Sequence, residues 1–225
     1  MRIAKIAPQG VESIRSFRLE VPTTIEPPSF DFVPGQFLQV HTPAGESSYF
    51  AIASAPGEPY YELLVKRAQG ASKALFELPI GTVLDVVEPQ GRGFPLTEHA
   101  GRDVLLIGVG TGIAPLRSVL WWTLSRPEAF GRLILLYGVL TPPHWCYRDD
   151  FQAWRHAGVD VRVTVTSGDA SWTGPVGFVQ DLLPALDLAP SNTVACLVGM
   201  KDMINANTAW LKAAGIPSER ILLNF

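Results

Sequence analysis

Hydrophobic residues follow two different patterns along this chain, one in each half. In the first half they form short runs that alternate with polar residues, as expected for antiparallel strands with one buried face. These runs cover residues 11–21, 35–41, 48–54, 60–67 and 82–88. Turn residues such as Pro34-Gly35 and Pro56-Gly57 separate them. Short strands at this spacing predict a small antiparallel β-barrel.

In the second half, fully apolar runs alternate with helical stretches. The apolar runs cover residues 103–109, 132–139, 159–166 and 193–199. The helical stretches lie near residues 113–125, 148–157, 176–186 and 201–214. Strands that are apolar on both faces and separated by helices indicate a parallel sheet with helices on both sides. We therefore predict two domains, a barrel at residues 1–99 and an α/β domain at residues 100–225, with the boundary near residues 97–102.

Composition excludes several classes of protein. The chain has 225 residues, of which 47% are hydrophobic, so it is too apolar to be disordered and long enough for two cores. Its net charge is -3 and it has no run of lysine and arginine, which argues against nucleic acid as a partner. Cys146 and Cys196 stand alone, without the spacing of metal ligands, so we expect no metal site.

One stretch is apolar enough to suggest a membrane span. Val104 to Leu124 contains a single charge, Arg117. Four residues in it break or end a helix: Gly108, Gly110, Gly112 and Pro115. We therefore predict a strand, a glycine loop and a helix instead. The N-terminal residues lack the apolar region of a signal peptide, so we expect a cytoplasmic protein.

The glycine loop between that strand and that helix is the clearest local motif. Glycines at residues 108–112 let the backbone approach a pyrophosphate closely, and the helix N-terminus offers free N–H groups. Pro115 fits the first helical turn. The position of the loop favours dinucleotide binding over a purely structural turn. No Gly-Lys-Ser/Thr follows, so the loop is not a P-loop.

A second glycine loop, Gln69-Gly70-Ala71-Ser72, precedes a short predicted helix in the barrel. It is either another phosphate site or a simple helix start in which the Ser72 hydroxyl caps the helix. The strand at residues 48–54 carries aromatic side chains that either stack on a flat ring or pack in the barrel. His41, after the strand at 35–41, is either a neighbour of such a ring or a polar residue at the rim.

In combination, these motifs resemble the ferredoxin–NADP reductase superfamily, in which a flavin-binding barrel precedes a nicotinamide-nucleotide domain. The resemblance covers the whole chain. It rests on Pro34-Gly35-Gln36-Phe37, Lys66-Arg67 with Gly70-Ala71-Ser72, Gly91-Arg92-Gly93-Phe94-Pro95, Gly108 to Pro115, and Val198 to Met203, where the family has C-G-P-x-x-M.

The resemblance implies a flavin-dependent NAD(P)H oxidoreductase that passes a hydride from nicotinamide to flavin and electrons to an unidentified acceptor. It implies FAD rather than FMN. Around the flavin it places Ser48, Tyr49, Phe50, Ala51, Ile52, Val65, Lys66, Gly70, Ala71, Ser72 and Phe225. Around the nucleotide it places Gly110, Thr111, Gly112, Pro115, Ser167, Asp169, Gly199, Met200 and Met203.

The chain also departs from the family pattern. The family's R-x-Y-S becomes Ser48-Tyr49-Phe50-Ala51, which removes an arginine that pairs with a flavin phosphate and a hydroxyl near the reactive flavin nitrogen. Val198 replaces the family's cysteine beside the nicotinamide, and Met200 replaces its proline. The sequence up to Phe225 carries no cysteine cluster, which resembles the short branch without a C-terminal iron–sulfur cluster. Asp169 would repel a 2′-phosphate, which favours NADH slightly over NADPH.

Two other functions remain open. The chain is either such an enzyme or a flavin-binding electron-transfer subunit that works only inside a complex. The missing arginine and hydroxyl also allow a binding or regulatory protein on the same scaffold that has lost its flavin. The electron acceptor is not specified by the sequence.

Overall fold

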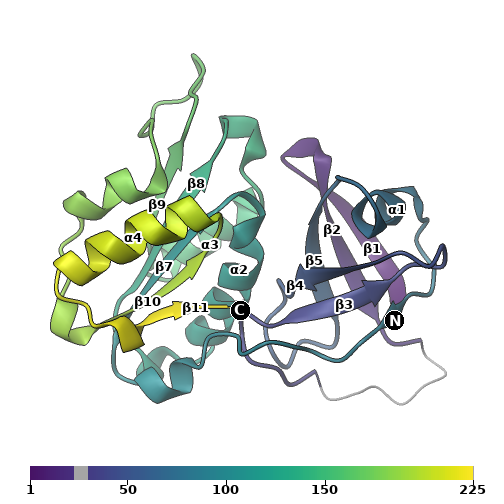
Figure 1. The fold of residues 1–225 in the computed structure, drawn as a ribbon, viewed down its shortest axis with the longest axis horizontal. Helices are drawn as coiled ribbons and strands as arrows, with labels where there is room; N and C mark the ends of the chain where they lie inside the picture. Colours follow the sequence, from purple (N-terminus) through teal and green to yellow (C-terminus); the bar gives the residue numbers. More distant parts are fainter. Residues whose placement is uncertain (23–29, 225) are drawn as a thin grey trace.

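The computed structural model describes residues 1–22 and 30–224. Phe225, which the resemblance places beside the flavin, lies outside the described residues. Figure 1 shows two lobes side by side, an antiparallel lobe built from the first half of the chain and an α/β lobe built from the second. Near the C-terminus, Asn224 Nδ2 donates to the Gly35 carbonyl at 3.4 Å, so the described chain ends between the two lobes.

The first lobe consists of two three-stranded antiparallel sheets and one helix. One sheet has the order β1-β2-β5, with β1 (Arg2–Gln9), β2 (Val11–Glu20) and β5 (Tyr61–Lys66). The other has the order β4-β3-β6, with β4 (Ser47–Ala51), β3 (Phe37–His41) and β6 (Asp85–Val86). Helix α1 (Ala71–Glu77) follows β5. Alternate residues such as Phe17 and Leu19 of β2 meet Leu38 and Val40 of β3 in one core.

The second lobe is a five-stranded parallel sheet with the order β11-β10-β7-β8-β9. Its strands are β7 (Asp103–Val109), β8 (Leu133–Val139), β9 (Asp160–Val165), β10 (Thr193–Val198) and β11 (Ile221–Leu223). Successive residues of β7 enter different cores: Val104 and Leu106 pack with residues of α2 and α3, whereas Leu105 and Ile107 pack with residues of η5 and α4. The sheet is therefore covered on both faces, as its fully apolar strands predicted.

The helices of this lobe are α2 (Ile113–Leu124), α3 (Arg148–His156), α4 (Lys201–Ala213) and the 3₁₀ helix η5 (Val179–Ala185). Shorter 3₁₀ turns are η1 (Leu96–His99), η2 (Gly110–Gly112), η3 (Pro127–Ala129), η4 (Pro142–His144), η6 (Pro190–Asn192) and η7 (Ser218–Arg220). Among the described residues no helix has the length and apolar character needed to span a bilayer. The apolar stretch from Val104 to Leu124 divides into β7, a glycine turn and α2.

Several expected elements differ from the structure. The strand expected at 82–88 is only β6, because pairing with β3 is limited to Val86 and Asp85. The helix expected at 176–186 is a 3₁₀ helix, in which Pro184 cannot donate an α-helical hydrogen bond. Strands β1 and β11 were not expected. Ser72 does not cap α1: Gly70 is the N-cap, and the Ser72 hydroxyl instead donates to the Gln69 carbonyl at 2.9 Å.

The strand order predicts where a ligand would bind in this lobe. From β7 the chain continues to β8 and β9 on one side of the sheet, whereas β10 and β11 lie on the other side. Parallel sheets bind ligands in the crevice outside the carboxyl ends of the strands at such a switch point. The loops after β7 and β10 are therefore the expected ligand loops.

Candidate functional site

The loop after β7 is held in a defined shape by its neighbours. Gly110 has a φ of 55°, a conformation that favours glycine. Its carbonyl accepts a hydrogen bond of 2.9 Å from the hydroxyl of Tyr137, a fully buried residue of β8. Gly112 packs so closely on the loop after β10 that a Cβ there would lie 2.9 Å from the Val198 carbonyl oxygen. The two glycines thus shape one loop for two different reasons, backbone conformation and space.

A cavity of about 360 Å³, here called the switch-point cavity, lies between this loop, the loop after β10 and strand β4 of the first lobe. Its lining residues are Ala51, Val109, Thr111, Gly112, Pro115, Val198, Gly199 and Met200. Six of these eight residues are among those predicted from the sequence to bind cofactors. The cavity therefore joins residues from both predicted binding sites, which are far apart in the sequence.

The chemistry of the switch-point cavity is apolar. None of its eight lining residues has an ionisable side chain, and Thr111 supplies the one hydroxyl among them. Val198 stands where the family resemblance places a thiol, and Met200 is 71% exposed at the cavity. Such walls can orient a flat ring and exclude water, but they cannot exchange protons.

Strand β4 presents the predicted flavin-binding residues on two faces. Phe50 is half-buried and packs against the core of the first lobe, and Ser48 lies on the same face. Tyr49 lies on the other face, 58% exposed, with its ring 5.4 Å from that of Phe37 in an edge-on contact. Ile52 and Val65 are buried in the barrel core, so only their backbone is available to a ligand.

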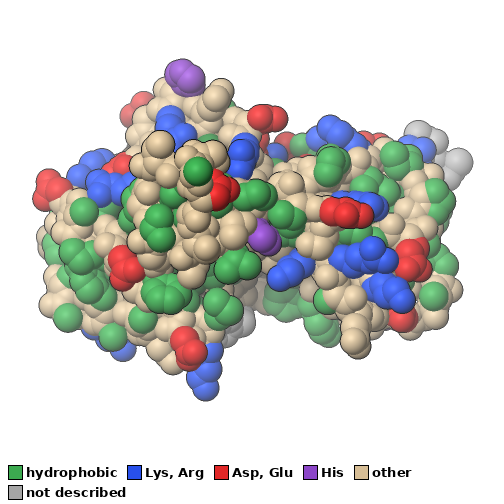
Figure 2. Space-filling view, turned by 90° about the horizontal axis from the view of Figure 1, so that it is seen from above, with side chains coloured by type: hydrophobic (Ala, Val, Ile, Leu, Met, Phe, Trp, Pro, Cys, Tyr) green, Lys and Arg blue, Asp and Glu red, His purple; other side chains and the backbone are tan. Residues whose placement is uncertain are grey.

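The loop that begins α1 has an open backbone and exposed cations around it. Gly70 has a φ of 59° and nothing lies within 4 Å of the position of a Cβ, so its backbone is open to a ligand. Lys66, Arg67 and Lys73 are exposed around this loop, and Figure 2 shows lysine and arginine side chains gathered on this half of the face. These charges favour an anion, although Arg67 also pairs with Glu77 at 3.9 Å.

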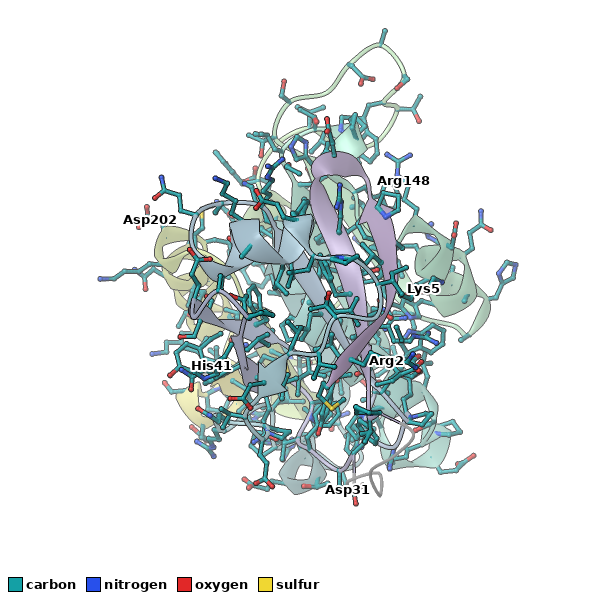
Figure 3. All side chains as sticks on the ribbon, turned by 90° about the vertical axis from the view of Figure 1, so that its right-hand side faces the viewer. Arg2, Lys5, Asp31, His41, Arg148 and Asp202 are labelled. Atoms are coloured by element: carbon teal, nitrogen blue, oxygen red, sulfur yellow. The ribbon has the colours of Figure 1, made fainter. Side chains whose placement is uncertain are left out.

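The remaining predicted residues do not line the switch-point cavity. Ser167 and Asp169 are exposed in the loop after β9. Hydrogen bonds from the Ser171 hydroxyl and amide lower the pKa of Asp169, so this side chain stays a carboxylate. Met203 is buried in α4, with its methyl group against Gly199. His41 pairs with Ser47 at the end of β3 and lies on the opposite side of the molecule from Lys5 and Arg148 (Figure 3).

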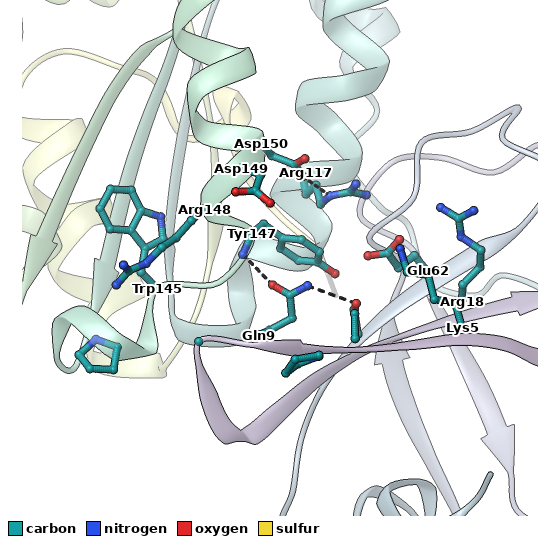
Figure 4. A pocket seen from close by; sticks show the side chains of 15 residues that line it. Lys5, Gln9, Arg18, Glu62, Arg117, Trp145, Tyr147, Arg148, Asp149 and Asp150 are labelled. Atoms are coloured by element: carbon teal, nitrogen blue, oxygen red, sulfur yellow. Dashed lines mark hydrogen bonds and ion pairs between the residues drawn. The ribbon is translucent and has the colours of Figure 1, made fainter. Parts of the chain in front are cut away.

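A second and larger cavity, of about 730 Å³, lies where the β1–β2 hairpin meets the second lobe; it is here called the hairpin cavity (Figure 4). Its charged and aromatic lining residues are Lys5, Arg18, Glu62, Arg117, Trp145, Tyr147, Arg148, Asp149 and Asp150. Sequence reasoning did not assign a role to any of them. The sequence feature that could have indicated this cavity is Arg117, the single charged residue between Val104 and Leu124.

Comparison with known proteins identifies two domain families in this chain. The model of the oxidoreductase FAD-binding domain matches residues 9–94, and that of the oxidoreductase NAD-binding domain matches residues 106–208. Ferredoxin–NADP reductase B of Sorangium cellulosum is 35% identical over 166 residues, which cover 70% of this chain and 67% of that protein.

Other relatives are longer than this chain. Sulfhydrogenase 1 subunit gamma of Pyrococcus furiosus is 28% identical over 192 residues, covering 84% of this chain but 65% of that protein. The ferredoxin reductase in carbazole 1,9a-dioxygenase has the same fold, with a TM-score of 0.85 and 24% identity, and the match covers 99% of this chain and 67% of that one. The chain thus spans about two thirds of the length of these relatives.

Proposed function

Because the chain belongs to the ferredoxin–NADP reductase family of FAD- and NAD-binding flavin oxidoreductases, we propose that its two cofactors meet at the switch-point cavity. When bound, the flavin serves as hydride acceptor for the nicotinamide and as electron donor to a further acceptor. The task of the protein is then to bind both cofactors, align their rings and exclude water.

One observation carries this proposal: Ala51 of the FAD-binding lobe lines the same cavity as Gly112 and Gly199 of the NAD-binding lobe. Ala51 ends the strand that contains Phe50, while the two glycines belong to the loops at the switch point. A single cavity bordered by both predicted sites is the geometry that transfer between two stacked rings requires.

Residues of each lobe have distinct proposed roles. Gly70, Ser72 and the nearby cations Lys66 and Arg67 would hold the flavin phosphates, and Phe50 would lie against its ring. The N–H groups at Gly110 to Gly112, at the start of α2, would hold the nucleotide phosphates with the help of the helix dipole. The apolar walls of the switch-point cavity would keep water from the reacting atoms.

The loop after β9 supports a preference between the two nicotinamide nucleotides. Asp169 is exposed and held as a carboxylate by its hydrogen bonds to Ser171. A carboxylate there would repel the additional phosphate of NADPH. We therefore assign NADH as the preferred nucleotide.

The absorption spectrum of the purified protein tests the proposal. The protein is loaded with FAD, freed of unbound flavin, and mixed anaerobically with NADH and, in a parallel sample, with NADPH. The proposal predicts a yellow protein whose flavin absorption bleaches with NADH at a higher kcat/KM than with NADPH. Protein that cannot retain FAD would contradict it and would indicate a scaffold that has lost its flavin.

A second function, that of a partner-dependent electron-transfer subunit, is favoured by the names of several relatives. Sulfhydrogenase 1 subunit gamma is by name a subunit of a larger enzyme. On this alternative, the protein would retain FAD but bleach slowly with NADH until its partner is added. The same spectrum therefore separates the two functions.

A further inference from the structure

Arg117 is a buried cation that lines the hairpin cavity and connects the two lobes. It lies in the second turn of α2, and its side chain is only 12% exposed. Its Nη1 donates to the Ala53 carbonyl of the first lobe at 2.8 Å. Its Nε donates to Asp150 Oδ2 of α3 at 2.6 Å, as Figure 4 shows, and its guanidinium carbon lies 4.7 Å from the centre of the Tyr147 ring.

The charged and aromatic partners of Arg117 come from both lobes. Glu62 of β5 is 8% exposed and belongs to the first lobe, whereas Asp150 and Tyr147 belong to the second. Burial alone would lower the pKa of Arg117, but Glu62, Tyr147 and Asp150 together raise it above its ordinary value. The cation is therefore permanent, and removing its side chain would leave Glu62 and Asp150 without this partner in a partly buried place, which is costly.

On the first lobe, Arg117 holds the chain segment that directly follows the cavity wall. Ala53 lies two residues after Ala51, which lines the switch-point cavity. The Ala53 amide donates to the Glu62 carbonyl at 2.7 Å, so this segment is fixed to β5 as well. A shift at Ala53 would be transmitted through one intervening residue to Ala51.

On the second lobe, Arg117 is part of the element that forms the opposite wall. Pro115 and Gly112, which line the switch-point cavity, lie two and five residues before it, at the start of α2. A helical turn is stiff over this distance, so the position of Arg117 fixes the position of these residues. The Arg117 side chain thus connects the segment that carries Ala51 with the helix that carries Pro115.

A second contact between the lobes lies at the hairpin and does not use the Arg117 side chain. The Tyr147 amide donates to Gln9 Oε1 at 2.9 Å, and Gly10 packs so closely on Pro143 that a Cβ would lie 2.3 Å from its carbonyl oxygen. We expect this contact to keep the lobes together when Arg117 is removed. Loss of Arg117 should therefore change the alignment of the walls without separating the lobes.

We propose that Arg117 is a positioning residue for transfer between the two cofactors, because it holds Ala51 in register with Gly112 and Pro115. This inference rests on the proposed function. A misplacement of about 1 Å at a reacting centre lowers a rate by about 100-fold, whereas binding that depends on other contacts changes little. The expected result of removing Arg117 is a slower transfer step with nearly unchanged cofactor affinity.

The test compares Arg117→Met with the wild-type protein by two measurements. In the first, FAD-loaded protein is mixed anaerobically with increasing NADH, which gives the limiting rate of flavin bleaching and the half-saturating NADH concentration. We expect the limiting rate to fall by about 10- to 100-fold and the half-saturating concentration to stay within about twofold. Arg117→Lys keeps the charge but presents one compact ammonium in place of the planar fork that reaches Ala53 and Asp150 together, so it should fall between the two.

The second measurement needs no cofactor. Spin labels at Glu46→Cys and Gln152→Cys, two exposed positions on different lobes, report the distance distribution between the lobes in the apoprotein. We expect Arg117→Met to broaden or shift this distribution. Both native cysteines are buried and are not expected to take up label. If the wild-type flavin is not reduced by NADH, the proposed function fails, but this distance measurement still tests the connection between the lobes.

Arg132→Met is the matched control, because Arg132 pairs with Asp103 at 2.9 Å entirely within the second lobe. It should leave the limiting rate and the distance distribution as in the wild type. The proposal is overturned if Arg117→Met bleaches at the wild-type rate, if it slows no more than Arg132→Met, or if its distance distribution is unchanged. Should Arg117→Met fail to fold, Arg117→Lys and Glu62→Gln are compared with the wild type by the same two measurements. We expect smaller changes in the same direction.

Discussion

Gly112→Ala tests whether the space between the two nucleotide loops is needed for nucleotide binding. Gly112 has φ and ψ of -62° and -9°, which any residue adopts, so its backbone does not require glycine. An added methyl group would lie 2.9 Å from the Val198 carbonyl oxygen and 3.2 Å from Val198 Cγ1. Because the nearer atom belongs to the backbone and cannot rotate away, the loops after β7 and β10 must move apart by about half an ångström to reach van der Waals distance.

The expected size of the effect follows from two opposing contributions. Overpacking of this kind costs about 1–3 kcal/mol. Replacing glycine by alanine in a permitted conformation also stabilises the fold by about 0.4–1 kcal/mol, because alanine lowers the conformational entropy of the unfolded chain. The free energy of unfolding should therefore fall by only about 1 kcal/mol. The loops that border the switch-point cavity are displaced directly, so we expect the Kd for NADH to rise by about tenfold, which corresponds to about 1.4 kcal/mol.

Titration of the FAD-loaded protein with NADH, together with thermal unfolding, measures both quantities. Gly45→Ala is the control, because Gly45 lies in a distant turn with open space around the added methyl group. Because Gly45 has a φ of 84°, which alanine adopts only with strain, this control should lower the free energy of unfolding and leave the Kd for NADH unchanged. An unchanged Kd in Gly112→Ala, with an intact fold, would refute the role assigned to this close contact.

Three further predictions concern single side chains. Tyr137→Phe removes the hydrogen bond to Gly110 and should lower the free energy of unfolding by about 1 kcal/mol and weaken NADH binding severalfold; titration showing wild-type affinity would exclude a positioning role for the hydroxyl. Asp169→Ser should raise kcat/KM for NADPH relative to NADH, and an unchanged ratio would show that Asp169 does not select the nucleotide. Burial raises the pKa of Cys146 from 9.0 to about 11, so the folded protein keeps a proton that the unfolded chain releases above pH 9. Stability measured by thermal unfolding should therefore fall between about pH 9 and pH 11, by about 2–3 kcal/mol from this thiol, and Cys146→Ala should remove that part of the fall.

The architecture was predictable because most of it depends on local patterns. The apolar run at 103–109 and the glycine loop after it predicted β7 and the start of α2 almost to the residue. The strand expected at 82–88 was too long because its hydrophobic residues Val83 and Val87 are 60% and 37% exposed and the ladder with β3 covers Asp85 and Val86. A pattern of valines indicates a strand, but the length of the strand depends on its partner.

The site was only partly predictable because it depends on contacts distant in sequence. The lining residues Thr111, Gly112 and Gly199 follow from the loops in which they lie, but their meeting with Ala51 depends on how the lobes are oriented. Arg117 donates to a carbonyl 64 residues away, and no local pattern reveals such a contact. Its isolation in an apolar helix was nevertheless a usable signal, since a buried arginine requires acceptors.

The most direct test of the central claim is the bleaching of the flavin in Ala51→Leu beside the wild type. Leucine at this position would fill part of the switch-point cavity while leaving the loop at Gly70 untouched. If the cofactors meet in this cavity, Ala51→Leu should retain FAD but bleach with NADH far more slowly than the wild type under anaerobic conditions. Bleaching at the wild-type rate in a fully FAD-loaded Ala51→Leu protein would show that the cofactors meet elsewhere.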